Sequence, residues 1–255
     1  MLFLLATLMA CGPSFKDVQS QDTIEGYEAF IAAAPSSPSA FTAKLRLEQL
    51  YLERAETQGT LDAYDAYMDK YSDDPQAKLM EKAKEGREAF AYQSAVDANT
   101  AAAWQLYLDE YPKGQKKFKQ EARRRLTVLE YVDNLEIGPA EIEGTNMAED
   151  PDGPLDGFMI RADMKNNGDK DIKSLNIAIE YLDAEGKVIE TDKWPWVAPR
   201  APGNIPIEEE WKVPVKSGEE RVYTYMDTAP NAPGWAKKVR LVPISIYFVE
   251  EEAGK

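Results

Sequence analysis

The strongest constraint on the fold is an internal repeat in the first half of the chain. Three segments of similar pattern begin with threonine, at positions 23, 60 and 100: TIEGYEAFIAAAP, TLDAYDAYMDKYS and TAAAWQLYLDEYP. Threonine is a good helix N-cap, because its hydroxyl accepts a hydrogen bond from a free backbone N–H of the first turn. Large or apolar residues then recur at intervals of 3, 1 and 3, which marks one stripe along a helix. The stripes are Tyr27, Phe30, Ile31 and Ala34; Tyr64, Tyr67, Met68 and Tyr71; and Trp104, Tyr107, Leu108 and Tyr111.

A second helix is predicted after each of these segments. Breakers and caps separate the two helices of each pair, at residues 35–38 (PSSP), 73–75 (DDP) and 112–114 (PKG). The repeat length of about 37 to 40 residues is typical of a solenoid of helix-turn-helix units. In such an array the aromatic stripe packs against the neighbouring helix, so we interpret it as core. The tyrosines off the stripe, Tyr51, Tyr92 and Tyr131, are candidates for exposed contacts with a partner.

The helical segment resembles a tetratricopeptide repeat, whose pattern is W-x2-L-G-x2-Y in the first helix and A-x3-F in the second. Residues 104–111 (WQLYLDEY) and 122–126 (ARRRL) are its best copy, with Leu108 where the family has a small residue. The resemblance covers about residues 22 to 131. The resemblance implies three helical hairpins and does not indicate which partner they bind.

Near Val132 the sequence changes to short β-branched or alternating runs separated by turns. Strands are predicted at 135–143, 157–165, 172–182, 188–196, 211–215, 221–226 and 238–249. The segments 166–169 (NNGD) and 183–186 (DAEG) are predicted hairpin connections, in which glycine supplies a positive φ. About seven strands in roughly 120 residues indicate an antiparallel, immunoglobulin-like β-sandwich.

Part of this half resembles the FxLYD-type sandwich of bacterial envelope proteins. An Asn-Gly-Asp turn comes before a hydrophobic strand that ends in IEYLD at 179–183, and a glycine turn follows. Residues 217–219 (SGE) fit the Gly-Glu element before a later strand. The match covers roughly residues 155 to 249 and implies a fold and an accessory role.

Two features of this half are candidates for ligand binding. Asp150, Asp152 and Asp156 offer carboxylates of the kind that Ca2+ uses, but prolines restrict wrapping and no bidentate glutamate follows at the right distance. We interpret the segment as an acidic surface loop and expect neither a metal nor a cofactor. Trp194 and Trp196 lie near a proline-rich segment, where they either stack on a sugar or partner or pack at a strand edge.

The N-terminus indicates a cellular location. Residues 1–10 read MLFLLATLMA, an apolar run of the length found in signal peptides, and Cys11 is the only cysteine of the chain. Residues 8–12 (LMACG) resemble the lipobox of bacterial lipoproteins, in which signal peptidase II cuts before the cysteine and the thiol carries a diacylglyceryl group. The resemblance implies lipidation at Cys11 and an anchor in the bacterial cell envelope, at the outer membrane facing the periplasm. The alternative is a short buried strand with a core cysteine.

Charge and composition narrow the function classes. The formal net charge of −15 repels nucleic acid, whose phosphates need clustered lysine and arginine. The one basic cluster, residues 113–125 (KGQKKFKQEARRR), is interpreted as a solvated helix face, with a binding patch as the alternative. The chain has no histidine, which removes the usual general base and the Ser-His-Asp and Cys-His nucleophiles. We therefore expect that the chain is not an enzyme.

The sequence thus predicts a multidomain protein of helices followed by strands. The expected parts are a signal segment with the lipidated cysteine (1–11), a tether (12–21), tetratricopeptide-like repeats (22–132) and an immunoglobulin-like β-sandwich (133–255). We expect a scaffold or adaptor that binds envelope proteins, contacts the membrane only through its N-terminal lipid and binds no nucleic acid. The alternative is a module that captures a glycan or Ca2+ through its C-terminal half.

The lipid anchor is directly testable by the substitution Cys11→Ser. Each buried methylene of an acyl chain contributes about 0.8 kcal/mol to membrane binding, and two anchoring signals suffice for stable attachment. The variant should appear in the soluble fraction, or remain unprocessed, in cell fractionation followed by immunoblotting. A variant that stays membrane-bound at the size of the wild type would show that Cys11 carries no lipid.

Overall fold

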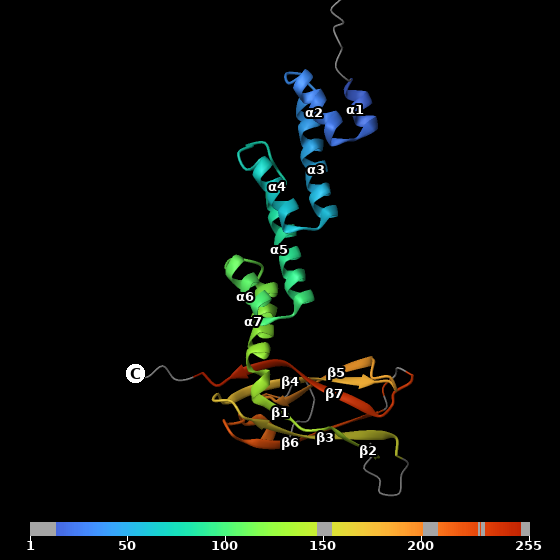
Figure 1. Ribbon diagram of the computed structural model, residues 1–255, viewed down its shortest axis with the longest axis vertical. Coiled ribbons are helices and arrows are strands. Elements are labelled where there is room, and N and C mark those ends of the chain that lie inside the picture. The colour runs from blue at the N-terminus through green and yellow to red at the C-terminus, as the bar shows by residue number, and fades with distance from the viewer. Residues whose placement is uncertain (1–13, 147–154, 201–208, 229, 231–232, 251–255) are drawn as a thin grey trace, which may run out of the picture. The chain divides into compact units, whose positions relative to one another are not determined.

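The computed structural model describes residues 14–146, 155–200, 209–228, 230 and 233–250 (Figure 1). Within these ranges the chain forms seven α-helices and two antiparallel β-sheets. Its contacts divide it into two compact units, and the division lies between Ala98 and Asn99. None of the helices in the described ranges is both long enough and apolar enough to cross a membrane.

The first unit is built of helices that pack in chain order. They are α1 (Phe15–Gln21), α2 (Ile24–Ala33), α3 (Ala40–Gln58), α4 (Leu61–Tyr71) and α5 (Met80–Ala98). Consecutive helices contact one another from α1 to α5. Two apolar clusters hold them together, one centred on Tyr27 and Phe30 and the other on Tyr64 and Tyr67.

The threonine caps and the aromatic stripe are confirmed. The hydroxyls of Thr23, Thr60 and Thr100 each accept a hydrogen bond of 3.2 Å from the backbone N–H three residues later. The leading stripe residues are buried, with Tyr67 and Trp104 each 1 % exposed. Their burial supports the interpretation of the stripe as core, because a buried aromatic ring contributes a large apolar area to packing.

The second unit combines the last two helices with all of the described strands. Its helices are α6 (Ala101–Glu110) and α7 (Lys116–Tyr131), followed by the 3-10 turn η1 (Val132–Asn134). In one sheet, β3 (Gly157–Asn166) pairs with β6 (Glu220–Thr228) on one edge and with β1 (Leu135–Ile137) and β2 (Glu141–Thr145) on the other. In the second sheet β4 (Ile172–Leu182) lies between β5 (Val188–Val197) and β7 (Lys238–Phe248).

Three of the predicted strand features are wrong in detail. The strand predicted at 135–143 is broken into β1 and β2, because Pro139 has no N–H for a ladder hydrogen bond. The segment predicted as a strand at 211–215 begins in the 3-10 helix η2 (Glu209–Lys212) and leaves only a single bridge from Val215 to Ile172. The segment 166–169 is not a hairpin, since β3 and β4 belong to different sheets.

Helix α7 packs against strand β7 and closes the end of the core between the sheets. Val128 and Tyr131 belong to the same buried cluster as Met164 of β3 and Ile246 of β7. Tyr131 is 5 % exposed, so the expectation that its ring is an exposed partner contact is wrong. The boundary predicted at 132/133 falls inside this second unit, because the last turn of the helix supplies part of the core of the sheets.

Gly168 is needed for close approach and not for a positive φ. The φ angle of Gly168 is not positive, whereas Gly186 in the β4–β5 hairpin has φ 83°. A Cβ at Gly168 would collide with the hydroxyl and ring of Tyr131. This glycine therefore lets the β3–β4 connection close over the end of α7.

The contribution of α7 can be tested with two fragments of the second unit. Residues 99–255 should unfold in one cooperative transition, while residues 133–255 lack Val128 and Tyr131 and should melt at a much lower temperature. Tyr131→Ala in the longer fragment should itself cost about 3 to 5 kcal/mol, the usual loss for truncating a buried aromatic ring. Thermal melts followed by circular dichroism would measure both. Equal stability of the two fragments would show that the strands form a domain without the helix.

Candidate functional site

The acidic and lipidation candidates fall largely outside the described residues. Cys11, Asp150 and Asp152 lie in segments that the structure does not describe, and Asp156 is described and exposed. In the described part of the chain, no group of three or more acidic, histidine or cysteine side chains is placed to hold a metal ion.

The aromatic candidates of the second unit pack inside the protein. Trp196 is 2 % exposed and its ring stacks on Tyr223, with centroids 4.7 Å apart and an interplanar angle of 7°. Trp194 is partly buried and meets Tyr225 edge to face at 4.9 Å. An exposed aromatic platform for a sugar is therefore wrong for Trp196, whose face is already covered by another ring.

The remaining tyrosine candidates are partly buried. The hydroxyl of Tyr51 donates to Glu28 Oε1 at 2.5 Å, and the charged end of Arg54 lies 4.5 Å from its ring centre. Lys70 Nζ lies 4.3 Å from the same centre and 3.2 Å from Glu28 Oε1. Tyr51 thus helps to join α2, α3 and α4. Tyr92 on α5 is also only partly exposed.

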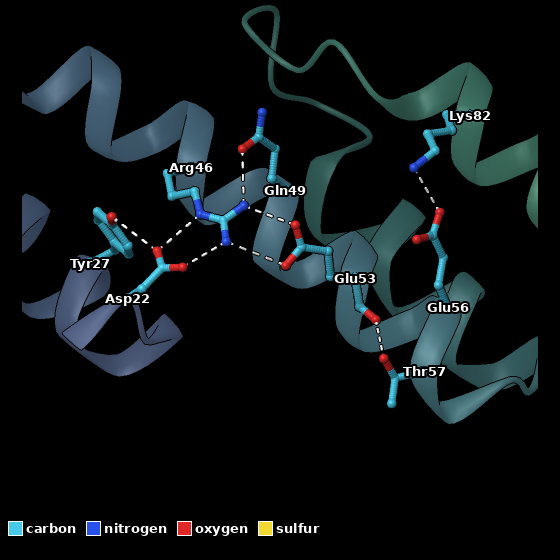
Figure 2. Close-up of polar contacts among 8 residues, drawn as sticks. All are labelled: Asp22, Tyr27, Arg46, Gln49, Glu53, Glu56, Thr57 and Lys82. Carbon is cyan, nitrogen blue, oxygen red and sulfur yellow. Dashed lines mark hydrogen bonds and ion pairs between the residues drawn. The ribbon is translucent and has the colours of Figure 1, made fainter. Parts of the chain in front are cut away.

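Arg46 organises an ion-pair network on α3 (Figure 2). Its guanidinium donates to Asp22 at 2.7 and 2.9 Å and to Glu53 at 2.9 Å. Asp22 ends α1 in the left-handed conformation, with φ 46°. The hydrogen bonds from Arg46 hold the pKa of Asp22 below its ordinary value. The network holds the α1–α2 connection against α3, so we assign it to the fold.

An open groove of about 590 Å3 lies between α7 and β7 and is the best candidate for a binding surface. Helix α7 contributes Lys117, Arg123 and Arg124, and β7 contributes Tyr247, which is 54 % exposed. Arg124 is held in place by a hydrogen bond of 3.1 Å from Nη1 to the carbonyl of Ile244. With Glu121 also in the lining, the groove carries a net positive charge beside an exposed aromatic ring.

Glu121 also lines the groove and pairs with two arginines of α7, one of which, Arg124, belongs to the lining. Arg124 and Arg125 both donate to its carboxylate, at 2.5 and 2.8 Å. Partial burial raises the pKa of Glu121, but the hydrogen bonds from Arg124 and Arg125 lower it by a larger amount. The pKa of Glu121 therefore lies below its ordinary value. A carboxylate that stays ionised keeps both guanidinium groups oriented along the helix.

The sequence analysis identified the residues of one wall of this groove, the wall formed by α7. The basic cluster at 113–125 was interpreted as a solvated helix face, and part of it instead lines the groove. The other wall comes from β7, more than a hundred residues later in the chain, and no local pattern connects the two. The sequence carries no further signal for this wall, because Tyr247 is the one large exposed hydrophobic side chain of β7 and single exposed apolar residues are ordinary on a protein surface.

Comparisons with known proteins place the chain in no family. No family model matches, and no curated protein matches. Several solved structures are similar at a low level, among them the following three. Structural genomics target SoR45 has 12 % identity and a TM-score of 0.26, covering 48 % of this chain and 89 % of its own. The protein described as ApaA from Bordetella pertussis has 14 % identity and a TM-score of 0.25, covering 47 % and 95 %.

The third similar structure is the alkylpurine DNA glycosylase AlkC of Pseudomonas fluorescens, bound to DNA that contains an abasic-site analogue. It has 9 % identity and a TM-score of 0.35, covering 90 % of this chain and 72 % of its own. Because this neighbour is an enzyme, the expectation that the chain is not an enzyme is corrected and withdrawn. At this TM-score the likeness assigns neither a fold nor an activity to the chain.

The role of Glu121 predicts a pH-dependent effect of Glu121→Gln on the full chain. A carboxyl whose folded pKa is lowered stabilises the protein above its unfolded pKa, and this contribution disappears as the pH falls through the folded value. The variant should lose up to about 1 kcal/mol at pH 7, as expected for partly exposed ion pairs, and little below pH 3. Thermal melts at both pH values would measure the difference.

The matched control is Glu130→Gln, an exposed glutamate on the same helix. It should leave the melting temperature unchanged at both pH values. An equal loss for Glu121→Gln at pH 7 and at pH 3 would contradict an electrostatic role.

Proposed function

We propose that this protein is a lipid-anchored adaptor of the bacterial cell envelope that binds another protein. In this proposal Cys11 carries the lipid, the helices form tetratricopeptide-like hairpins and the two sheets form an immunoglobulin-like sandwich of the FxLYD type. The anchor lies in the outer membrane and the rest of the chain faces the periplasm. The resemblances in the sequence support these assignments, and the paired helices and antiparallel sheets are compatible with them.

The observation that carries the proposal is the groove between α7 and β7. Lys117, Arg123 and Arg124 line it in a chain of net charge −15, so it stands out from the acidic remainder. Clustered positive charge accelerates encounter with an acidic surface and opposes basic ones. Tyr247 adds an exposed aromatic ring, a residue type enriched where protein interfaces gain most of their binding energy. We therefore propose that the partner presents an acidic segment to this groove.

The alternative, capture of a glycan or Ca2+ through the C-terminal half, is not carried forward. Trp196 is buried and Trp194 is partly buried with its ring against Tyr225, so this pair does not form an open platform for a sugar. Asp150 and Asp152 lie outside the described residues and add no observation in its favour.

Site-specific cross-linking tests the groove in the native envelope. A photoreactive phenylalanine analogue in place of Tyr247 should give a discrete adduct on irradiation of cells that make the full chain. The double substitution Lys117→Glu and Arg123→Glu should abolish the adduct, because it reverses two charges in the groove. Raised salt should weaken the adduct in envelope extracts, since exposed charge attraction is screened.

The charge-matched control is the double substitution Lys116→Glu and Lys119→Glu on the same helix, because neither lysine lines the groove. This variant should keep the adduct. An adduct that persists after both groove charges are reversed, or the absence of any adduct, would contradict the groove as the binding surface.

A further inference from the structure

A second, smaller pocket of about 240 Å3 lies in the first unit, between α2, α3, the end of α4 and the segment that follows it. Most of its wall is apolar. Ile31 contributes from α2, and Phe41, Leu45 and Leu47 contribute from α3. Two polar groups in the same wall, Glu48 and Tyr71, are deeply buried and incompletely bonded.

Glu48 is a buried carboxylate with one oxygen in use. It is 3 % exposed, and its Oε1 accepts three hydrogen bonds. The donors are the Tyr67 hydroxyl at 2.9 Å and the backbone N–H groups of Lys78 and Leu79 at 2.8 and 2.7 Å. None of the described residues donates to Oε2, and Tyr71, not this oxygen, supplies the fully buried polar atom of the pocket that has no partner. The carboxylate of Glu48 therefore keeps one oxygen that can accept a hydrogen bond from a ligand.

Tyr71 leaves a second polar atom unsatisfied. It is 8 % exposed and lines the same pocket, and its buried hydroxyl has no hydrogen-bond partner among the described residues. The ring of Tyr67, which donates to Glu48, packs on the ring of Tyr71 with centroids 5.0 Å apart. Glu48 and Tyr71 therefore belong to one stretch of wall. Buried polar atoms without partners are uncommon in folded proteins, and a bound water, ion or ligand is one explanation for them.

The charges around the pocket favour a cation. Asp74 adds a second carboxylate to the lining. Lys70 also lines it, but its ammonium is engaged with Glu28 and the Tyr51 ring. Lys44 is exposed to solvent, where water screens its charge. Lys78 Nζ lies 5.7 Å from the ring centre of Phe41, and Lys78 is not one of the residues that line the pocket.

We propose that this pocket binds a primary ammonium group carried on an apolar stem, either a lysine side chain of a partner or a free alkylamine. The ammonium donates to Glu48 Oε2 and to the hydroxyl oxygen of Tyr71. The stem lies against Ile31, Phe41 and Leu45. The groove of the proposed function lies in the other unit, so this inference stands independently of that function.

The donor and acceptor inventory excludes other ligand classes. An ammonium has three donors and no acceptor, which suits two free acceptor atoms. A carboxylate or phosphate would face the charge of Glu48 at close range. An alcohol of the same length would satisfy one hydrogen bond and leave the charge of Glu48 without a counter-ion.

Titration of the full chain with n-hexylammonium chloride, at constant ionic strength, tests the proposal. The amide resonances of Lys78 and Leu79 report on the pocket, because both N–H groups bind Glu48. We expect saturable shifts of these resonances, with n-hexanol binding at least about tenfold more weakly because charged hydrogen bonds are the stronger ones. Nα-acetyl-lysine methylamide is the second probe. Binding as tight as that of hexylamine would identify a lysine side chain as the source, and much weaker binding would identify a free amine.

Two variants separate binding from folding. In Glu48→Gln the amide oxygen can keep the three hydrogen bonds of Oε1, while an NH2 group replaces the free Oε2 and should weaken hexylamine binding by about tenfold or more. Tyr71→Phe removes only the unpartnered hydroxyl, so it should keep or raise the melting temperature while it weakens binding. Glu88→Gln is the matched control, because Glu88 is buried on α5 and does not line this pocket.

Two results would overturn the proposal. One is that hexanol and hexylamine shift the Lys78 and Leu79 resonances equally, or that the shifts caused by hexylamine do not saturate. The other is unchanged affinity in both Glu48→Gln and Tyr71→Phe while the two variants remain folded. Glu88→Gln should bind hexylamine as the wild type does, and a loss there equal to that in Glu48→Gln would assign the effect to general destabilisation.

Discussion

A single buried amide side chain, that of Asn166, holds the second unit together. It is fully buried at the end of β3, and its Oδ1 accepts hydrogen bonds from the Tyr131 hydroxyl at 2.8 Å and the Gly168 N–H at 3.3 Å. Its Nδ2 donates to the carbonyls of Lys170 at 2.9 Å and Lys216 at 3.2 Å. One side chain therefore connects a helix, the crossing between the sheets and the segment before β6. In a buried network of this kind every bond matters, because water cannot replace a lost partner.

This network explains why the last helix belongs with the strands. Tyr131 enters the core at the point where the chain leaves one sheet for the other, and Gly168 gives its hydroxyl room. Once α7 is held there, its basic side chains necessarily lie along β7. The candidate binding groove is thus formed by the same packing of α7 against β7 that completes the core. A partner bound in it would contact two elements whose relative position is fixed.

Local features could be predicted from the sequence, and long-range ones could not. The threonine caps and the helical stripe depend on residues within two turns of one another, so their spacing carries the whole signal. The break at Pro139 was equally local and was overlooked. In contrast, Tyr131 was misplaced because its partner Asn166 lies far along the chain. The Glu48 pocket was missed for the same reason, since Tyr71 and the N–H groups of Lys78 and Leu79 reach it only after α3 and α4 have packed together.

The distribution of indole rings gives the two units different optical properties. All five tryptophans, at positions 104, 194, 196, 211 and 235, follow the division at Ala98, and the first unit contains only tyrosine and phenylalanine rings. Trp104, Trp196 and Trp211 are buried, so their emission shifts to longer wavelength when water reaches them. Tryptophan fluorescence therefore follows the loss of structure in the second unit alone. A titration monitored by helical circular dichroism and indole emission together would show whether the two units of one chain unfold at the same concentration of denaturant.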